Sequence, residues 1–476
     1  MDIKKKERGI LFTVGLTELG ERYSYYILQA LLIFFLMKKF SLTQGESNSL
    51  AGTTMGVIYI SSIIGGYIAD KILNNYLAAL LGAILLMAGN FLLAFFDSHN
   101  FLYLGLAFIS ISTGLIKSNM SSFLSYFYFK SKLSSARRDF GFNFFYISIN
   151  LGSFIALSFA TSMVNKYGFY ATFYSCFLAS ILIIINLVVG YLKLKEYITQ
   201  YQFTLESFLK LIFILTLYIG GIFYIFANVF IAESFISITS IICLFILYKS
   251  AQKKYWSNVF ASVIYFILSI IFWSIFMQMF LSINLFIDSN VSHNLFSFDI
   301  NTSQFLSVEA LGILFFGGIV GWLWLFLEKK NISLLEIDKF NLSFILLALT
   351  LLFFYVAIMH GNLHDKVPAI VFIIGFLLMS ISELFLSAIG LSIITKIAPP
   401  GFVSLYMAIW LVTIGLGAKL AGYISTFINV VKDDNYQSRI NISHGLVILI
   451  CISIAGSLIS FLSRKKVNNI VKEVIE

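Results

Sequence analysis

Glu18, Glu21 and Arg22 lie in the middle of an otherwise apolar segment, residues 9–38, that is long enough to cross a lipid bilayer. A charged side chain at that depth costs roughly 2.5 to 3.5 kcal/mol on insertion scales, so these groups must face protein or water. Helical spacing allows this, because one polar face holds Glu18, Glu21, Arg22, Tyr25 and Gln29. The pattern predicts a helix that lines a pathway, with carboxylates that move protons. The alternative is an internal salt bridge that only holds helices together.

The composition is that of a membrane protein. Of the 476 residues 59% are hydrophobic and 12% are charged, against about 25% charged in an average soluble domain. The apolar segments are far too long for the strands of a barrel, so we expect an all-α polytopic protein in contact with the lipid bilayer. The net charge of +9 is spread over loop ends. It therefore does not indicate a nucleic-acid partner.

Fourteen helices are expected, separated by turn signals such as Asn74-Asn75 and Pro399-Pro400-Gly401. Their ranges are 9–38, 47–70, 76–96, 101–129, 139–164, 169–193, 204–229, 234–250, 255–287, 303–328, 339–359, 367–396, 401–431 and 441–463. Twelve of them divide into two sets of six, in residues 1–196 and 255–476. The remaining two would form an inserted hairpin in residues 197–254.

Lysine and arginine placement predicts the orientation. If the N-terminus is inside, 22 Lys and Arg residues fall in inner segments and 6 in outer segments, which places both termini in the cytoplasm. The basic start of the chain resembles that of a signal peptide, but the apolar run behind it is too long and too charged to be one. The three cysteines form no pairing pattern and the five histidines lie in loops or at helix ends. We expect no metal site and no cofactor other than protons as the coupling ion.

The run Glu18-Leu-Gly-Glu21-Arg22-Tyr23-Ser-Tyr25-Tyr26 resembles the first-helix signature of the proton-dependent oligopeptide transporters, a branch of the major facilitator superfamily. The two sets of six helices fit the major facilitator plan, and the bacterial members also carry two extra helices between the halves. Gly65, Gly66 and Asp70 are similar to the family's motif at the end of the second helix. We interpret this motif as part of conformational gating.

Two further motifs carry polar residues into the membrane. Thr113-Gly114-Leu-Ile-Lys117-Ser118-Asn119 resembles a fourth-helix motif, and Lys117 needs an acidic partner, for which Glu18 and Glu21 are the candidates. That pairing is either proton-sensitive and in reach of a peptide carboxylate, or purely structural. Asn150 falls in a run that resembles the fifth-helix signature. It is a candidate partner of the substrate backbone, or else an interhelical amide contact.

The seventh core helix departs from the family pattern. Its run Phe272-Trp273-Ser-Ile-Phe276-Met277-Gln278, followed by Asn284, has Met277 where the family has a glutamate. On the next core helix the family's asparagine is replaced by Glu309. We infer that Glu309 stands in for the missing acid in proton coupling. The alternative is a structural partner for Lys419 or another cation.

The tenth-helix run Ser382-Glu383-Leu-Phe-Leu-Ser387 also resembles the family, in which this glutamate meets the amino group of the substrate. Ser387 shares the face of Glu383. Trp410 matches a pocket aromatic of the family, although a packing aromatic is an equal alternative. Gln29 is a departure, because peptide transporters often have an arginine at its position.

These features predict a symporter that imports di- and tripeptides with protons by alternating access, and no enzyme. The residues expected to couple protons are Glu18, Glu21, Arg22, Lys117 and Glu309. Substrate contacts are expected from Arg22, Tyr25, Tyr26, Gln29, Tyr59, Lys117, Asn150, Asn284, Glu309, Glu383, Ser387 and Trp410. Gln29 and Met277 leave open another small solute, such as an amino acid, an anion or a drug. A membrane-embedded enzyme and a receptor without transport are the alternatives from other classes. We expect a monomer in a bacterial inner membrane.

Overall fold

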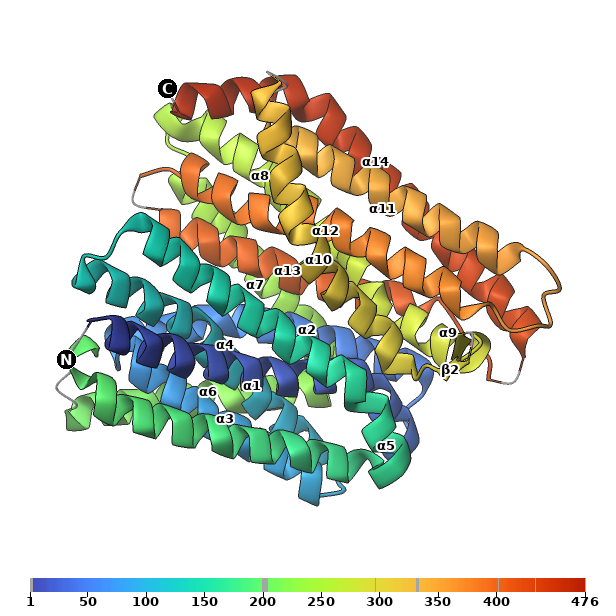
Figure 1. Ribbon diagram of the computed structural model, residues 1–476, viewed down its shortest axis with the longest axis horizontal. Helices are drawn as coiled ribbons and strands as arrows, with labels where there is room; N and C mark the ends of the chain where they lie inside the picture. The colour runs from blue at the N-terminus through green and yellow to red at the C-terminus, as the bar shows by residue number, and fades with distance from the viewer. Residues whose placement is uncertain are drawn as a thin grey trace. The chain divides into compact units, whose positions relative to one another are not determined.

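The computed structural model describes residues 3–198, 204–295, 297–330, 334–400, 402–432 and 434–475. Almost all of them are helical (Figure 1). The α-helices are α1 (Ile3–Lys39), α2 (Gln44–Lys71), α3 (Asn75–Phe95), α4 (His99–Ser131), α5 (Ser135–Leu194), α6 (Leu205–Ala227), α7 (Val229–Ser250), α8 (Trp256–Phe276), α9 (Ser282–Asn290), α10 (Thr302–Lys329), α11 (Glu336–Met359), α12 (Ala369–Ile397), α13 (Val403–Thr426) and α14 (Asn435–Ile475). The shorter elements are the 3-10 helices η1 (Lys195–Tyr197), η2 (Lys253–Tyr255) and η3 (Met277–Phe280), and the antiparallel strands β1 (Asn294–Leu295) and β2 (Phe298–Asp299).

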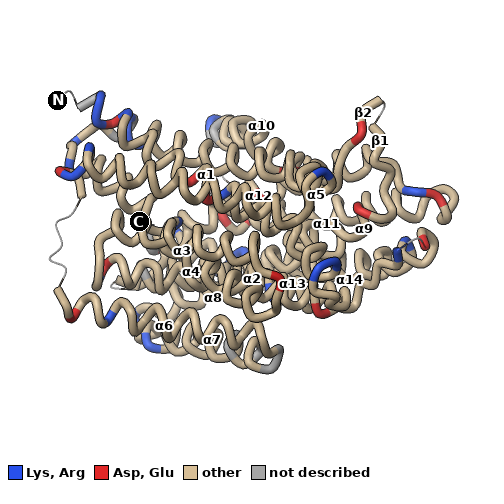
Figure 2. The backbone as a smooth tube through the Cα atoms, turned by 90° about the horizontal axis from the view of Figure 1, so that it is seen from below, with Lys and Arg blue, Asp and Glu red and all other residues tan. Residues whose placement is uncertain are grey.

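Eleven segments of the described chain are long and apolar enough to cross a membrane. Helix α1 is not among them, in keeping with the several charges that it carries. In Figure 2 most Lys, Arg, Asp and Glu residues lie near helix ends, and only a small number lie along the middle of a helix. The predicted class, an all-α polytopic membrane protein, is confirmed.

Most of the predicted helices agree with the observed ones to within a few residues, but α1 begins at Ile3 where the prediction began at 9, and α14 spans Asn435–Ile475 where the prediction was 441–463. The predicted ranges 139–164 and 169–193 both lie in α5, where one non-helical residue, Gly168 with φ 84° and ψ 172°, separates two helical segments. Only glycine adopts this backbone conformation readily, so the chain changes direction there without a loop. The predicted helix 255–287 is wrong as a single helix, because η3 interrupts it between α8 and α9.

Side chains at the turns explain where several helices begin. The side-chain oxygen of Asn74 accepts a 2.8 Å hydrogen bond from the Leu77 amide at the start of α3. Ser98 and Thr204 play the same part for α4 and α6. Such caps bond amides that have no partner within the helix. Pro368 directly precedes α12, where its missing N–H costs nothing.

Contacts between Cα atoms divide the chain into two compact units. Unit 1 comprises Met1–Ser41 and Val57–Ala232, and unit 2 comprises Leu42–Gly56 and Glu233–Glu476. Helix α6 therefore groups with unit 1, and α7 from Glu233 onward groups with unit 2. The division into two sets of six helices, 1–196 and 255–476, with an inserted hairpin, 197–254, stays a prediction.

Unit 1 is built around α1 and α5, which lie side by side, with α3 packed on both α4 and α5 and α6 packed on α4 (Figure 1). Its interior contains polar contacts between helices. Asn90 Nδ2 donates hydrogen bonds to Ser24 Oγ at 2.8 Å and to Ser180 Oγ at 3.1 Å. Small and hydroxyl-bearing residues of this kind are the usual contacts between helices in lipid. They hold α1, α3 and α5 together and so fix the face of α1 that carries the charges.

Unit 2 packs α12 against α10 and α11, α8 against α13 and α14, and α11 against α14. Arg439, near the start of α14, is buried and donates hydrogen bonds to four backbone carbonyls, those of Ile358, His360, Asn362 and Asp365, at 2.6 to 2.9 Å. Ile358 lies in the last turn of α11, and the other three carbonyls lie between α11 and α12. One guanidinium thus ties α14 to the end of α11 and to the segment that leads into α12, in the unit that presents Glu309 and Glu383.

Candidate functional site

Glu21 and Arg22 form a buried ion pair in unit 1. Arg22 Nε donates a 2.5 Å hydrogen bond to Glu21 Oε2, and Arg22 Nη2 donates one of 2.8 Å to Oε1. The two side chains are 0% and 3% exposed. Thr113 on α4 donates a further 2.8 Å hydrogen bond from its hydroxyl to Glu21 Oε1. The acid is therefore held by a two-point, charge-assisted contact and by a neighbouring helix, which fixes its orientation.

Glu18 lies one turn before this pair and has no such support. Its side chain is fully buried, and no described group of unit 1 donates a hydrogen bond to either carboxyl oxygen. Glu21, Arg22 and Lys117 are the charged neighbours that act on it electrostatically. No ion pair joins Glu18 to Lys117 within the described residues of unit 1, so the predicted two-for-two pairing is found only for Glu21 with Arg22. A buried carboxyl without donors is suited to binding a proton.

Aromatic rings accompany both of the cations of unit 1 that are predicted site residues. The guanidinium carbon of Arg22 lies 4.6 Å from the ring centre of Tyr25, and Tyr25 packs edge-on against Tyr26. Lys117 Nζ lies 4.8 Å from the ring centre of Tyr59. Both distances fall within the range of cation–π contacts. The structure thus gathers the predicted residues Arg22, Tyr25, Tyr26, Tyr59 and Lys117 into two cation–aromatic groups.

The predicted gating motif lies at a tight contact between α2 and α4. A Cβ atom at Gly65 would collide with the backbone of Gly114, and one at Gly114 with the backbone at Ser61. Glycine is required at both positions because the two backbones touch. Gly66 faces no neighbour of this kind, and Asp70 is exposed. Gating by these residues stays a prediction.

Two of the predicted substrate-contact residues of unit 1, Asn150 and Gln29, have amide side chains. Asn150 on α5 is buried, and its Nδ2 donates a 2.9 Å hydrogen bond to the carbonyl of Tyr146 one turn earlier in the same helix. This bond lies within one helix and does not itself join two helices. Gln29 is buried on α1, two turns beyond Arg22. Substrate contact by either amide stays a prediction.

In unit 2, Glu309 lies on α10 and Glu383 lies on α12, and these two helices pack against each other. Glu309 is 5% exposed and Glu383 is half-buried. The ion pair between Glu309 and Lys419, the alternative drawn from the sequence, is not found among the described residues of unit 2. Lys419 Nζ instead donates hydrogen bonds to Thr53 Oγ1 at 3.0 Å and to Ser49 Oγ at 3.4 Å. Two acids predicted to play separate parts thus lie on neighbouring helices.

Met277 and Gln278 begin the turn η3 that interrupts the seventh core helix. Met277 is 2% exposed, so the position of the family's acid is filled here by a buried thioether. The carboxamide of Gln278 is fully bonded, with Nε2 donating 3.0 Å to the carbonyl of Ala421 and Oε1 accepting from Ser282 and Ser425 at 2.7 and 2.6 Å. Gln278 was not among the predicted site residues. The sequence feature that could have indicated Gln278 as a functional residue is its side-chain amide within a mostly apolar run.

Trp410, Asn284 and Ser387 complete the predicted residues of unit 2. Trp410 on α13 is 2% exposed, and a Cβ atom at Gly390 of α12 would overlap its indole ring. These contacts are those of a packing aromatic, and a substrate wall at Trp410 stays a prediction. Asn284 is buried on α9, and Ser387 lies one turn beyond Glu383 on α12.

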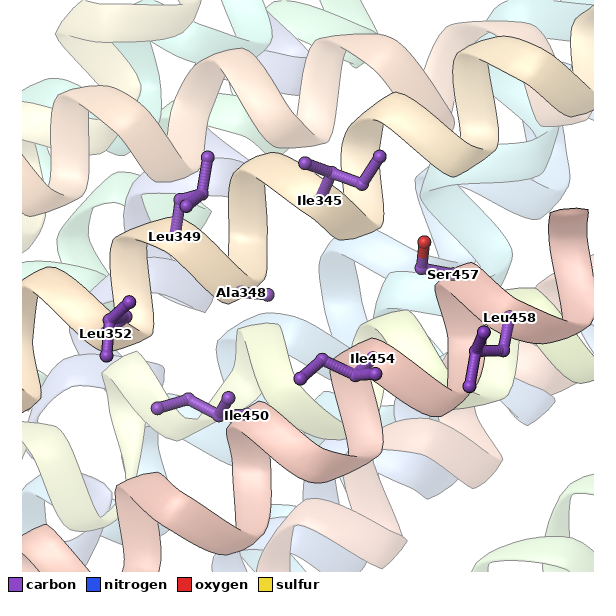
Figure 3. Close-up of a pocket in the computed structure, with 8 residues that line it drawn as sticks. All are labelled: Ile345, Ala348, Leu349, Leu352, Ile450, Ile454, Ser457 and Leu458. Carbon is purple, nitrogen blue, oxygen red and sulfur yellow. The ribbon is translucent and has the colours of Figure 1, made fainter.

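A groove of about 290 Å³ runs between α11 and α14 on the surface of unit 2 (Figure 3). It is lined by Ile345, Ala348, Leu349, Leu352, Ile450, Ile454, Ser457 and Leu458. The lining is almost wholly apolar, and no side chain in it can bind a charged group. It therefore suits lipid and not a zwitterionic solute.

In the described part of the chain no three His, Cys, Asp or Glu residues are grouped as metal ligands.

Comparisons with known proteins place this site in a family context. A model of the POT family matches residues 76–441. The chain is 28% identical over 453 residues to an uncharacterized transporter, YclF, of Bacillus subtilis, covering 91% of this chain and 90% of that protein. It is 27% identical over 426 residues to dipeptide and tripeptide permease B of Aliivibrio fischeri, covering 86% and 84%.

Solved structures agree in fold. The crystal structure of a peptide transporter POT in complex with sulfate superposes with a TM-score of 0.84 at 24% identity, covering 99% of each chain. A bacterial homologue of the human drug peptide transporters PepT1 and PepT2 gives a TM-score of 0.84 at 21% identity, covering 98% and 99%. These likenesses confirm the predicted all-helical fold of this family, whereas the division into two bundles and an inserted helix pair stays a prediction.

Proposed function

The chain belongs to the POT family, the proton-dependent oligopeptide transporters, and on that premise we propose that it is a symporter that carries di- and tripeptides together with protons. The relatives that it matches are bacterial, and its multiple apolar helices make it a membrane protein. We place it in the cytoplasmic membrane, with both termini in the cytoplasm as the distribution of Lys and Arg predicts.

The observation that carries the proposal is the buried charge on α1. Glu18, Glu21 and Arg22 are at most 3% exposed in the middle of α1, whose other charged residues lie near its two ends, and keeping them there is costly. Structure alone does not require a carboxyl such as Glu18, which binds no described group of unit 1. In a proton-driven transporter the same group has a use, because it takes up and releases a proton during the cycle.

The proposed substrate fits the charges of the two units. A dipeptide is a zwitterion whose charged ends lie about 5 to 7 Å apart, at roughly 3.3 to 3.6 Å per residue. Arg22 and Lys117 in unit 1 supply cations for its carboxylate, and Glu383 in unit 2 supplies an anion for its amine. We assign Tyr25, Tyr26 and Tyr59 to the side chains of the peptide, because aromatic surfaces accept many side chains.

The direct test is uptake of a labelled dipeptide into proteoliposomes, with and without an inward proton gradient. The proposal predicts accumulation only with the gradient. Accumulation should be faster when the interior is negative, because moving a charge through 100 mV is worth about 2.3 kcal/mol. Equal uptake under both conditions would exclude proton coupling, and no saturable uptake would exclude peptide transport.

A second candidate function is transport of a different small solute by the same mechanism. Gln29 and Met277 favour it, since the family pattern that the chain resembles has a cation at the first position and an acid at the second. Competition separates the two candidates. Unlabelled tripeptides should suppress dipeptide uptake, whereas free amino acids, nitrate-like anions or drugs should suppress it only if they share the site.

A further inference from the structure

A second pocket of unit 2, of about 400 Å³, lies where α11 leads into α12, beside the start of α14 (Figure 1). Its lining has two parts. The last turns of α11 supply an apolar part with Phe353 and Val356, and the segment after Met359 supplies a polar part with His360 and Lys366. The two kinds of surface thus follow each other in the order in which a membrane-spanning helix passes from hydrocarbon to water.

The helices around the pocket indicate its depth in the membrane. Both α11 and α12 are long and apolar enough to cross a bilayer, and the pocket lies at the polar segment that joins them. Tyr436 in the first turn of α14 is 44% exposed, and its ring stacks on that of His364 with 5.4 Å between the ring centres. Tyrosines in this position are typical of the membrane–water interface. The pocket therefore lies at the level of the lipid headgroups.

The polar part of the pocket has an excess of positive charge. Lys366 and Arg439 line it together with one acid, Asp365, so two cations and one anion leave one positive charge over. Lys366 is exposed and belongs to no ion pair within the described residues of unit 2. The guanidinium of Arg439 is buried and uses four of its five N–H donors on backbone carbonyls. In the part of the chain that the structure describes, its fifth donor, on Nη2, has no acceptor.

An apolar row on α11 connects this pocket with the groove between α11 and α14. Leu349, Leu352 and Val356 follow the spacing i, i+3 and i+7 and so share one face of the helix. The first two line the groove, where Figure 3 shows them, and the third lines the pocket. All three are 46 to 57% exposed, and the step from Leu352 to Val356 is about 6 Å along the helix axis. A hydrocarbon chain that leaves the pocket therefore meets apolar surface without a gap.

We propose that the pocket and the groove together bind one anionic phospholipid of the phosphatidylglycerol type. Its phosphate accepts hydrogen bonds from Lys366 and from the fifth donor of Arg439, and an acyl chain lies along Leu352 and Leu349. A zwitterionic headgroup is less favoured, because it brings an ammonium to a site that already has an excess of positive charge. The site is separate from the charged groups of α1 and does not depend on which solute the protein carries. In the orientation predicted from the sequence it faces the outer leaflet.

The test uses the whole protein, purified without lipid in a non-ionic detergent. Native mass spectrometry counts the bound lipid as dioleoyl-phosphatidylglycerol or dioleoyl-phosphatidylcholine is added. Wild type should bind one phosphatidylglycerol at a lower concentration than it binds phosphatidylcholine. Lys366→Gln should bind phosphatidylglycerol about fivefold more weakly, the factor that corresponds to about 1 kcal/mol for one basic residue at an anionic surface. The matched control, Lys432→Gln, removes an exposed lysine before α14 that does not line the pocket and should bind as wild type does.

Two further measurements separate a lipid from a free anion. Inorganic phosphate should not displace bound phosphatidylglycerol, because it has no acyl chain to fill the groove. Leu352→Ala should weaken binding of both lipids alike, whereas Leu342→Ala, on an exposed position of α11 outside the groove and the pocket, should not.

Three results would overturn the proposal. Wild type could bind the two lipids equally, or Lys366→Gln could bind phosphatidylglycerol as wild type does, and either outcome removes the anionic headgroup from the site. Displacement of the lipid by inorganic phosphate would instead show a site for small anions alone.

Discussion

The hydroxyl of Thr113 on α4 donates a 2.8 Å hydrogen bond to Glu21 on α1, across 92 positions of the chain. The same carboxylate accepts two bonds from Arg22, so three donors fix it. The two bonds from Arg22 lie within α1 and orient the carboxylate, and charge-assisted bonds of this kind are stronger than neutral ones. The bond from Thr113 joins the oriented carboxylate to α4, so Glu21 is a polar contact between the two helices.

We predict that Glu21→Gln abolishes gradient-driven uptake and leaves counterflow exchange of substrate measurable. The amide still bonds to Thr113 but cannot gain or lose a proton. Both modes are measured in the same proteoliposomes. Thr113→Val is the matched control, because it removes one hydrogen bond and keeps the acid, so it should retain driven uptake at a reduced rate. Loss of folding or of all binding in Glu21→Gln would favour a purely structural ion pair.

Truncation of Glu383 should distinguish substrates by their amino end. We expect Glu383→Ala to weaken peptides with a free amine by about 3 to 5 kcal/mol, the cost of removing one partner from a buried charge pair. Analogues blocked at the amine should be affected much less. Competition curves for the two sets of peptides give the comparison. Equal losses for both would show that Glu383 does not meet the amine.

A substitution at Met277 can introduce the glutamate that the family pattern has at this position. If its role has moved to Glu309, then Glu309→Gln should impair proton-driven uptake and shift its pH dependence. Met277→Glu together with Glu309→Asn should restore part of the uptake, since neighbouring helices pack at about 8 to 10 Å and a long side chain reaches from either one. Unaltered pH dependence in Glu309→Gln would contradict the exchange of roles.

Arg439 should matter for stability and not for transport chemistry. Arg439→Ala leaves four backbone carbonyls without their donor, and we expect a loss of at least ~3 kcal/mol. Arg464→Ala breaks a half-exposed ion pair and should cost no more than about 1 kcal/mol. Thermal unfolding of the two variants in detergent compares them. Equal melting temperatures would show that the Arg439 contacts contribute little.

The helices were predictable because each combines a long apolar run with turn residues at its ends, as at Asn74 and Pro368. The charged face of α1 was predictable for the same reason, since spacing within one helix depends on no other element. The break at η3 was not, because the run from Phe272 to Phe280 is apolar apart from Ser274 and Gln278, and nothing in it resembles a turn signal. The packing of α10 against α12, which carry Glu309 and Glu383, joins helices that α11 separates in the sequence, so spacing could not reveal it.

The turn η3 divides the seventh core helix into two segments, α8 and α9, which meet at Gln278. The carboxamide of Gln278 is hydrogen-bonded to Ala421 and Ser425 of α13. Each such bond contributes about 0.5 to 1.5 kcal/mol net, and a buried group left without its partner costs about 1 to 3 kcal/mol. A change in the angle between α8 and α9 that moves Gln278 away from α13 therefore has to break these bonds, so the angle between the two segments and the position of α13 are coupled.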